Sequence, residues 1–171
     1  MAPGRGGRRS VAGPWPEDER YDPDLLEAGA RRNVVDAYRY RRREAIVAEL
    51  DTRRHPPHVA IENFGNDANI ATVVRTANAF AAAAVHDVGR KRWNRRGSMV
   101  TDRYQHLHHH FGVTALAEFA GRHQLTVVAV DNTPAAQQLE SVRLPRNCML
   151  LFGQEGPGLS PEAVAHAAFK Q

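Results

Sequence analysis

The sequence of 171 residues contains one cysteine, Cys148, and no apolar stretch long enough to cross a membrane. A single cysteine cannot form an internal disulfide, so the sequence favours the reducing cytoplasm over a secreted, disulfide-stabilised protein. A membrane-spanning helix needs about 20 consecutive apolar residues, so no membrane partner is expected. The arginines near the N-terminus are not followed by an apolar segment, so no secretory signal is expected either.

Lysine is scarce as well, with two lysines against 21 arginines. This bias is typical of a GC-rich genome, but arginine is also the better residue for forked contacts with phosphate groups. The formal net charge of +4 favours an anionic partner without identifying it.

The chain is long enough for one domain with a buried core, and its composition places two segments before that domain. Residues 1–20 are rich in Gly, Pro and Arg and are expected to be disordered. Residues 21–56 are expected to form a helical extension. Within it we expect one amphipathic helix with a strongly basic face over residues 33–54, ending before Pro56 and Pro57.

From residue 57 to residue 171, strand and helix patterns alternate. Strand patterns occupy residues 58–63, 84–88, 125–131 and 147–152. Helix patterns, with apolar residues three and four positions apart, occupy residues 69–82, 113–123 and 160–170. The alternation predicts an α/β domain with a mainly parallel sheet. We also expect the strand over residues 147–152 to lie centrally in this sheet. Ligands of such sheets bind beyond the carboxyl ends of the strands. Three segments lie at those ends, residues 64–75, 89–104 and 153–160.

Residues 64–75 join a turn-rich stretch to a helix. Asn69 is expected to cap that helix, and Arg75 follows six residues later, about 9 Å along the axis at 1.5 Å per residue. Because helical side chains lean toward the N-terminus, Arg75 can reach back to the mouth of a site. A capped helix with an exposed arginine explains the same spacing without any site.

Residues 151–160, LFGQEGPGLS, form a glycine-rich loop after an apolar strand. Gly153 and Gly156 allow a ligand to approach the backbone closely. Glu155 would repel a phosphate, and the loop lacks the Lys-Ser/Thr ending of a nucleotide-triphosphate loop. The loop therefore suits a ligand with a cationic or hydroxyl-bearing part. A plain tight turn is the alternative.

Residues 89–97 place five basic side chains around one tryptophan. Arginine and lysine bind phosphates, and tryptophan stacks on bases. The segment therefore predicts RNA binding by Arg90, Lys91, Arg92, Trp93, Arg95 and Arg96, with a solvated basic loop as the alternative. The histidines of HLHHH, residues 106–110, fit no clear zinc pattern, so we expect a surface histidine cluster and no metal site.

The stretches NDANIATVVRTANAF and LFGQEGPGLS together resemble motifs one and two of the SpoU family of RNA ribose 2′-O-methyltransferases. That family belongs to the SPOUT superfamily of knotted α/β proteins, and the resemblance covers roughly residues 57–171. It implies a Rossmann-like sheet with a trefoil knot that binds S-adenosylmethionine. It also implies methyl transfer to a ribose 2′-hydroxyl of tRNA or rRNA in the cytoplasm, and a homodimer for the complete family domain.

The same resemblance assigns roles to single residues. The catalytic residues that it implies are Asn69, Arg75 and Glu155. The cofactor-binding residues that it implies are Phe152, Gly153 and Gly156. An arginine is not deprotonated in proteins, so we expect the arginine of this set to bind phosphate and stabilise the forming alkoxide rather than act as a base.

The family's third motif, an apolar strand with a Ser-Leu-Asn stretch leading into a closing helix, has no counterpart after residue 160. We therefore expect the C-terminal part of the methyltransferase domain to be missing and the knot to be incomplete. Two other functions stay open, a non-catalytic RNA-binding protein and an inactive fragment of such an enzyme. A dinucleotide enzyme is disfavoured because no G-x-G-x-x-G follows the first strand.

Overall fold

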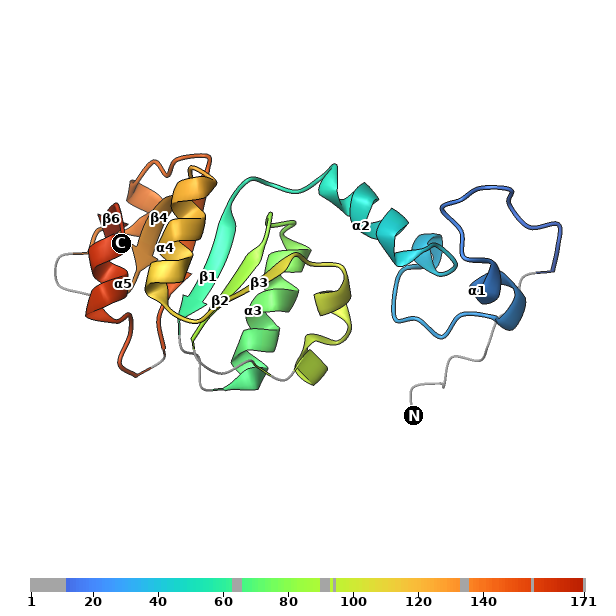
Figure 1. Ribbon diagram of the computed structural model, residues 1–171, viewed down its shortest axis with the longest axis horizontal. Helices are drawn as coiled ribbons and strands as arrows, with labels where there is room; N and C mark the ends of the chain where they lie inside the picture. The colour runs from blue at the N-terminus through green and yellow to red at the C-terminus, as the bar shows by residue number, and fades with distance from the viewer. Residues whose placement is uncertain are drawn as a thin grey trace. The chain divides into compact units, whose positions relative to one another are not determined.

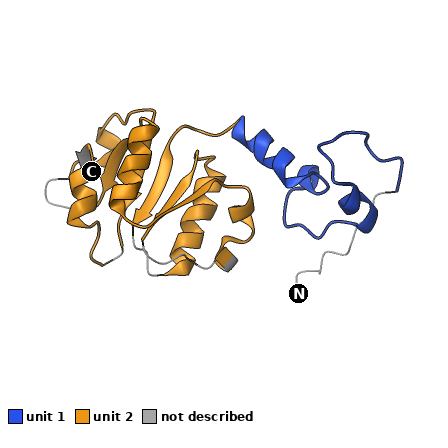
Figure 2. Cartoon of the chain, in the orientation of Figure 1, with its two compact units in different colours: residues 1–52 blue, residues 53–171 orange. Residues whose placement is uncertain are grey.

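The computed structural model describes residues 12–62, 66–89, 93, 95–132, 136–154 and 156–170, without the side chains of Arg96, Phe169 and Lys170. The chain divides into two compact units, residues 1–52 and 53–171 (Figure 2). The disordered tail expected over residues 1–20 lies largely outside the described residues. The domain boundaries expected after residues 20 and 56 stay predictions.

The first unit contains two short α-helices and a 3-10 turn, namely α1 Pro23–Ala28, η1 Asp36–Tyr38 and α2 Arg43–Asp51. The continuous helix expected over residues 33–54 is therefore not formed. The Asp22 N–H donates to the Tyr40 carbonyl at 2.9 Å, and the Arg42 N–H donates to the Arg20 carbonyl at 2.8 Å. These bonds flank a β-bridge between Tyr21 and Arg41 and leave Arg42 extended, so the helix begins only at Arg43.

The arginines of the first unit are offset by acidic residues. Residues 1–52 contain ten arginines and ten acidic residues, so residues 53–171 carry all of the net charge of +4. Arg41 forms an ion pair with Glu49, whose carboxylate also accepts the Tyr38 hydroxyl at 2.9 Å. The strongly basic face expected over residues 33–54 is thus partly neutralised by neighbouring carboxylates.

The second unit forms a six-stranded parallel sheet with the order β3-β2-β1-β5-β4-β6 (Figure 1). The strands are β1 His58–Glu62, β2 Val85–Val88, β3 Leu107–His110, β4 Thr126–Val130, β5 Cys148–Phe152 and β6 Phe169–Lys170. The longer helices are α3 Asp67–Ala79, α4 Val113–Arg122 and α5 Pro161–His166. The expected α/β fold is confirmed, and β5 is central as expected. Among the described residues, no helix is long and apolar enough to cross a membrane.

Two apolar clusters fill the space between the sheet and its helices. Ala60 and Val88 belong to the cluster that contains Leu116 of α4. Val85 belongs to the cluster that contains Val74 of α3. Because successive side chains of a strand point to opposite faces, α3 covers one face of the sheet and α4 covers the other. Burying both faces explains why β4 and β5 read as nearly continuous apolar runs.

The first long helix begins earlier than expected. Asn66 caps α3, with φ of −104° and ψ of 111°, and its side-chain oxygen accepts the Ala68 N–H at 2.9 Å. The expectation that Asn69 is the cap is therefore wrong. Capping at Asn66 places Asp67 in the first turn, where a negative charge favours the helix dipole.

The last helix is shorter than the expected residues 160–170. It starts as expected, because the Ser160 hydroxyl accepts the Ala163 N–H at 3.1 Å and Pro161 follows at the first helical position. It ends at His166, and the Ala168 N–H then donates to the Val127 carbonyl at 2.9 Å. Pairing with β4 thus replaces the last helical turn.

The HLHHH segment forms strand β3 rather than a surface cluster, so that expectation is wrong. β3 pairs in parallel with β2, with His108 opposite His86. Because side chains alternate along a strand, His108 and His110 face α4, whereas His109 faces α3. The histidines of β3 do not form an apolar strand pattern, so the sequence did not predict this strand. Pairing with β2 and packing against the helices place it in the sheet.

His58, His86 and His110 form a hydrogen-bonded chain across three neighbouring strands. His58 Nδ1 lies 2.8 Å from His86 Nε2, and His86 Nδ1 lies 2.9 Å from His110 Nε2. The Phe119 ring of α4 contacts all three imidazoles. Each hydrogen bond needs one donor and one acceptor nitrogen, so three neutral rings with one proton each satisfy the chain.

Burial keeps these imidazoles neutral. Desolvation, assisted by neighbouring histidines, lowers the pKa of the fully buried His86 to about 2 and the pKa values of His58 and His110 to about 4. A histidine in an unfolded chain titrates near ~6.5. The stability that depends on these rings is therefore fully present above that pH and is lost as the pH falls toward the folded-state values, because only the unfolded chain then binds protons.

We expect the free energy of unfolding to fall steeply between about pH 6.5 and about pH 4.5. Each histidine that takes up a proton only on unfolding adds about 1.4 kcal/mol per pH unit to this slope. Urea titrations at a series of pH values measure the slope. The variant His86→Met, which removes one such group, should give a shallower slope than the wild-type protein.

The variant His166→Gln, which removes an exposed imidazole, serves as the control and should keep the wild-type slope. If His86→Met and the wild-type protein share the same slope, the imidazole of His86 is not held neutral by the fold.

Candidate functional site

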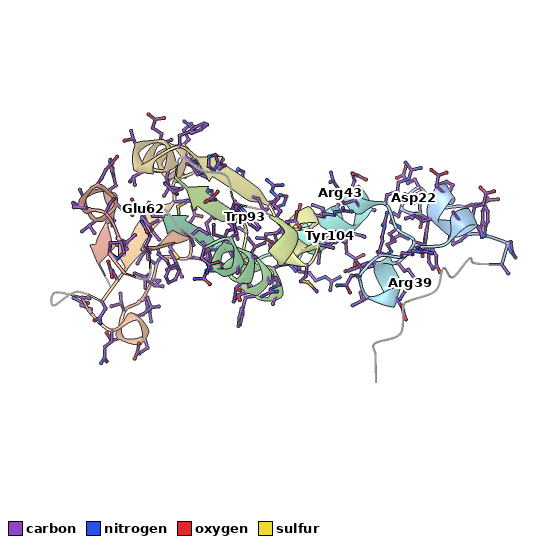
Figure 3. The ribbon with its side chains drawn as sticks, turned by 90° about the horizontal axis from the view of Figure 1, so that it is seen from below. Asp22, Arg39, Arg43, Glu62, Trp93 and Tyr104 are labelled. Carbon is purple, nitrogen blue, oxygen red and sulfur yellow. The ribbon has the colours of Figure 1, made fainter. Side chains whose placement is uncertain are left out.

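Two acidic side chains at strand ends hold the glycine-rich loop. Glu62, at the end of β1, is 3% exposed, and its Oε2 accepts the Ser160 N–H at 2.9 Å. Asp131, directly after β4, accepts the Leu159 N–H through Oδ2 at 2.9 Å. Figure 3 labels Glu62 at its strand end. Sequence reasoning missed both residues, although each is an acid at the end of a strand pattern.

The loop closes on itself through its backbone. Gln154 and Gly158 exchange two hydrogen bonds of 3.1 and 3.0 Å. A Cβ atom on Gly153 would lie 2.2 Å from the Gly158 carbonyl carbon. Gly158 itself has a φ of +70°, and its Cβ would lie 2.5 Å from Asp131 Oδ2. Both positions therefore require glycine.

The resemblance also assigns roles to Gly156 and Glu155 of this loop. A Cβ atom on Gly156 would meet nothing within 4 Å, so this glycine borders open space. Glu155, the expected second-motif carboxylate, lies outside the described residues.

An apolar groove of about 400 Å³ joins the glycine-rich loop to α3. It is lined by Val59, Thr72, Val73, Thr76, Ala77, Phe80, Ala82, Leu150, Phe152 and Gly153. Two of the three expected cofactor-binding residues, Phe152 and Gly153, thus face the same groove as the first motif's helix. We name this space the loop groove.

Arg75 is exposed and lies beside the loop groove. One of its guanidinium nitrogens donates to the Thr72 hydroxyl at 3.1 Å, and the other donates to the Gly97 carbonyl at 3.3 Å. Asn69 is half-buried, three residues before Thr72 and four before Val73, which places it on the groove side of α3. The structure thus brings Asn69, Arg75 and the described part of the second motif to one region.

The expected RNA-binding residues are only partly described. Arg90, Lys91 and Arg92 lie outside the described residues, as does the side chain of Arg96. Arg95 is exposed and begins the 3-10 turn η2 Arg95–Ser98. Trp93 is half-buried and packs against the apolar cluster under α3 (Figure 3), so its ring is anchored rather than free in solvent.

The sequence matches the SpoU rRNA Methylase family over residues 56–170. The chain belongs to this family. No curated protein matches the chain. Among the described residues, no group of three or more His, Cys, Asp or Glu side chains could hold a metal ion.

Solved structures of SpoU methyltransferases share the fold. The A. aeolicus TrmH/SpoU tRNA modifying enzyme is 23% identical with a TM-score of 0.63, covering 75% of this chain and 67% of that one. The AdoMet-bound rRNA methyltransferase from Sinorhizobium meliloti is 22% identical with a TM-score of 0.55, covering 71% and 49%. AviRb from Streptomyces viridochromogenes, in complex with AdoMet, is 15% identical with a TM-score of 0.59, covering 68% and 48%. The chain thus spans about half the length of the last two.

The close packing of Gly153 against the backbone of the loop predicts that a larger residue at this position destabilises the protein. We expect Gly153→Ala to lower the free energy of unfolding by about 1–3 kcal/mol, because the added methyl group must displace backbone atoms. Gly156→Ala is the matched control, since its methyl group would enter open space. Chemical denaturation of the two variants measures the difference. Equal stability of the two variants would mean that the loop is not packed on itself in this way.

Proposed function

We propose that residues 53–171 form the core of an S-adenosylmethionine-dependent RNA methyltransferase that modifies a ribose 2′-hydroxyl of tRNA or rRNA. The observation that carries the proposal is the loop groove. Within it Phe152 and Gly153 of the second motif meet Thr72 of the first, and Thr72 is hydrogen-bonded to Arg75.

The lining of the loop groove fits the proposed cofactor. S-adenosylmethionine combines an adenine ring and the methylene groups of its amino-acid chain with a cationic sulfonium, and it supplies the methyl group when bound. A groove lined by apolar side chains and two threonines suits the apolar parts. We assign Phe152, Gly153 and Gly156 to cofactor binding, with the glycines giving access to the backbone.

Arg75 is proposed to stabilise charge rather than to remove a proton. A guanidinium group is a permanent donor of N–H groups and cannot accept a proton. Its bonds to Thr72 and to the Gly97 carbonyl fix its orientation beside the loop groove before substrate arrives. Such preorganised charge stabilises a developing alkoxide and binds the neighbouring phosphate. Asn69 is proposed to orient the ribose, and Glu155 is assigned to the site by resemblance alone.

RNA is the proposed partner because residues 53–171 carry the whole net charge of +4. We also place the protein in the cytoplasm, which the buried and unpaired Cys148 supports. A homodimer belongs to the same proposal, since the groove-lining Phe80 is 75% exposed and apolar. The main alternative is an RNA-binding protein that transfers no methyl group.

Methyl transfer is tested with labelled S-adenosylmethionine and total tRNA or rRNA, followed by digestion to nucleosides and mass spectrometry. We expect 2′-O-methylated nucleosides with the wild-type protein. Arg75→Ala should lower the rate by about 100–1,000-fold, as expected for loss of a preorganised charge at the reacting oxygen. Arg146→Ala, which removes another exposed arginine, is the matched control and should keep wild-type activity.

Two outcomes would contradict this proposal. If the wild-type protein binds RNA but transfers no methyl group, the non-catalytic alternative holds. If Arg75→Ala methylates RNA as fast as the control variant, the assigned role of Arg75 is wrong.

A further inference from the structure

A second cavity, of about 630 Å³, lies between α3, η2 and strands β2 and β3. Its lining residues are Ile70, Val74, Val85, Asp87, Trp93, Arg95, Leu107, His108, His109 and His110. None of these residues lines the loop groove. The volume is typical of a site for a small organic ligand. We name this space the Trp93 cavity.

The walls of the Trp93 cavity suit a flat aromatic ring. Ile70 and Val74 of α3 supply one apolar wall. Trp93 is half-buried against the cluster that includes Val74, which anchors its indole at the edge of the cavity. An indole held in this way offers a flat face on which a nucleobase can stack.

The interior of the Trp93 cavity holds an acid and an imidazole with unused hydrogen-bonding capacity. Asp87 Oδ2 lies 3.0 Å from His109 Nδ1, and the two side chains are 12% and 15% exposed. Burial raises the pKa of Asp87, while the His109 hydrogen bond opposes the shift. His109 Nε2 is buried and has no hydrogen-bond partner among the described residues. A buried polar atom of this kind costs free energy unless a ligand or water satisfies it.

Positive charge is available at the same cavity. Arg95 is exposed, lines the cavity and acts on the Asp87 carboxyl by its charge. The η2 turn that carries Arg95 packs on α3, because a Cβ atom on Gly97 would lie 2.9 Å from Ala71 Cβ. The Gly97 carbonyl also accepts the Arg75 guanidinium at 3.3 Å. The Trp93 cavity and the loop groove therefore lie on either side of one arginine.

We propose that the Trp93 cavity binds an unstacked nucleobase of the RNA substrate. The base stacks on Trp93, its hydrogen-bonding edge meets Asp87 and His109, and Arg95 binds an adjacent phosphate. This inference rests on the proposed function only in taking RNA as the partner. It adds a base-recognition site beside the catalytic arginine.

The geometry selects guanine among the bases. When the His109 Nδ1–H donates to Asp87, His109 Nε2 and the second carboxylate oxygen of Asp87 are both acceptors. Guanine presents N1–H and the N2 amino group side by side, which offers two donors to such a pair. Uracil presents only N3–H on its Watson–Crick edge. We therefore expect guanine to bind more tightly than uracil.

The test uses the full chain with Trp15→Phe, which leaves Trp93 as the single tryptophan. Guanosine 5′-monophosphate and uridine 5′-monophosphate are titrated against its fluorescence. We expect saturable quenching with at least fivefold tighter binding of the guanosine nucleotide. A single-stranded RNA decamer containing guanosines should bind more tightly still, and more tightly than an oligouridine decamer.

Asp87→Asn in the same background should remove most of the guanosine preference and bring the two affinities to within about twofold of each other, since the bidentate base contact that discriminates between them is lost. Glu140→Gln, an exposed carboxylate-to-amide change, is the matched control and should leave the preference unchanged. The readout is the ratio of two affinities measured on one protein sample, so partial unfolding of the variant does not mimic the effect.

Three outcomes would overturn the inference. The first is equal or absent quenching by the two nucleotides. The second is an unchanged guanosine preference in Asp87→Asn. The third is free guanosine 5′-monophosphate binding as tightly as the guanosine-containing RNA, which would assign the cavity to a free nucleotide. Because none of these measurements needs methyl transfer, the Trp93 cavity can fail while the proposed activity holds, and the activity can fail while the cavity holds.

Discussion

The hydrogen bond that the buried Glu62 carboxylate accepts from the Ser160 N–H is the contact on which the arrangement of the site depends. It joins residues 98 positions apart and fixes the start of α5 to the end of β1. A buried carboxylate must find a donor, and a backbone N–H supplies it here, so this one contact does not depend on the Ser160 side chain. Asp131 makes the same kind of contact from β4. These two bonds hold Leu159 and Ser160 at the strand ends, against Gly153, the loop residue that lines the loop groove.

The alternation of strand and helix patterns predicted the fold class, but it did not predict every strand and helix. Strands β1, β4 and β5 carry branched apolar residues and were predicted nearly to the residue. β3 consists mostly of histidines and β6 has only two residues. Both form strands because they pair with a neighbouring strand, which the local sequence does not show. The helix expected over residues 33–54 failed for the same reason, because pairing with Arg20–Asp22 takes its backbone groups.

The candidate site was predictable where its residues are neighbours in sequence. The glycines of the loop and the arginine of the first motif's helix, Arg75, carry signals of their own. Glu62 and Asp131 do not, because their function comes from strand ends that meet only in the folded sheet. The sequence does not distinguish Asn66 from Asn69 as the helix cap, because both are asparagines. In the structure Asn66 is the cap, which places Asp67 in the first turn.

The central position of β5 also has a consequence for synthesis on the ribosome. β1 pairs with β5 in a register that sets His58 against Met149, so one edge of β1 stays unpaired until residues 148–152 have been made. At ~5–20 residues per second, translation of the intervening segment takes roughly 5–20 s. During that time β1, β2 and β3 form an incomplete sheet with an open apolar edge, which is a target for chaperones and for mispairing with another nascent chain.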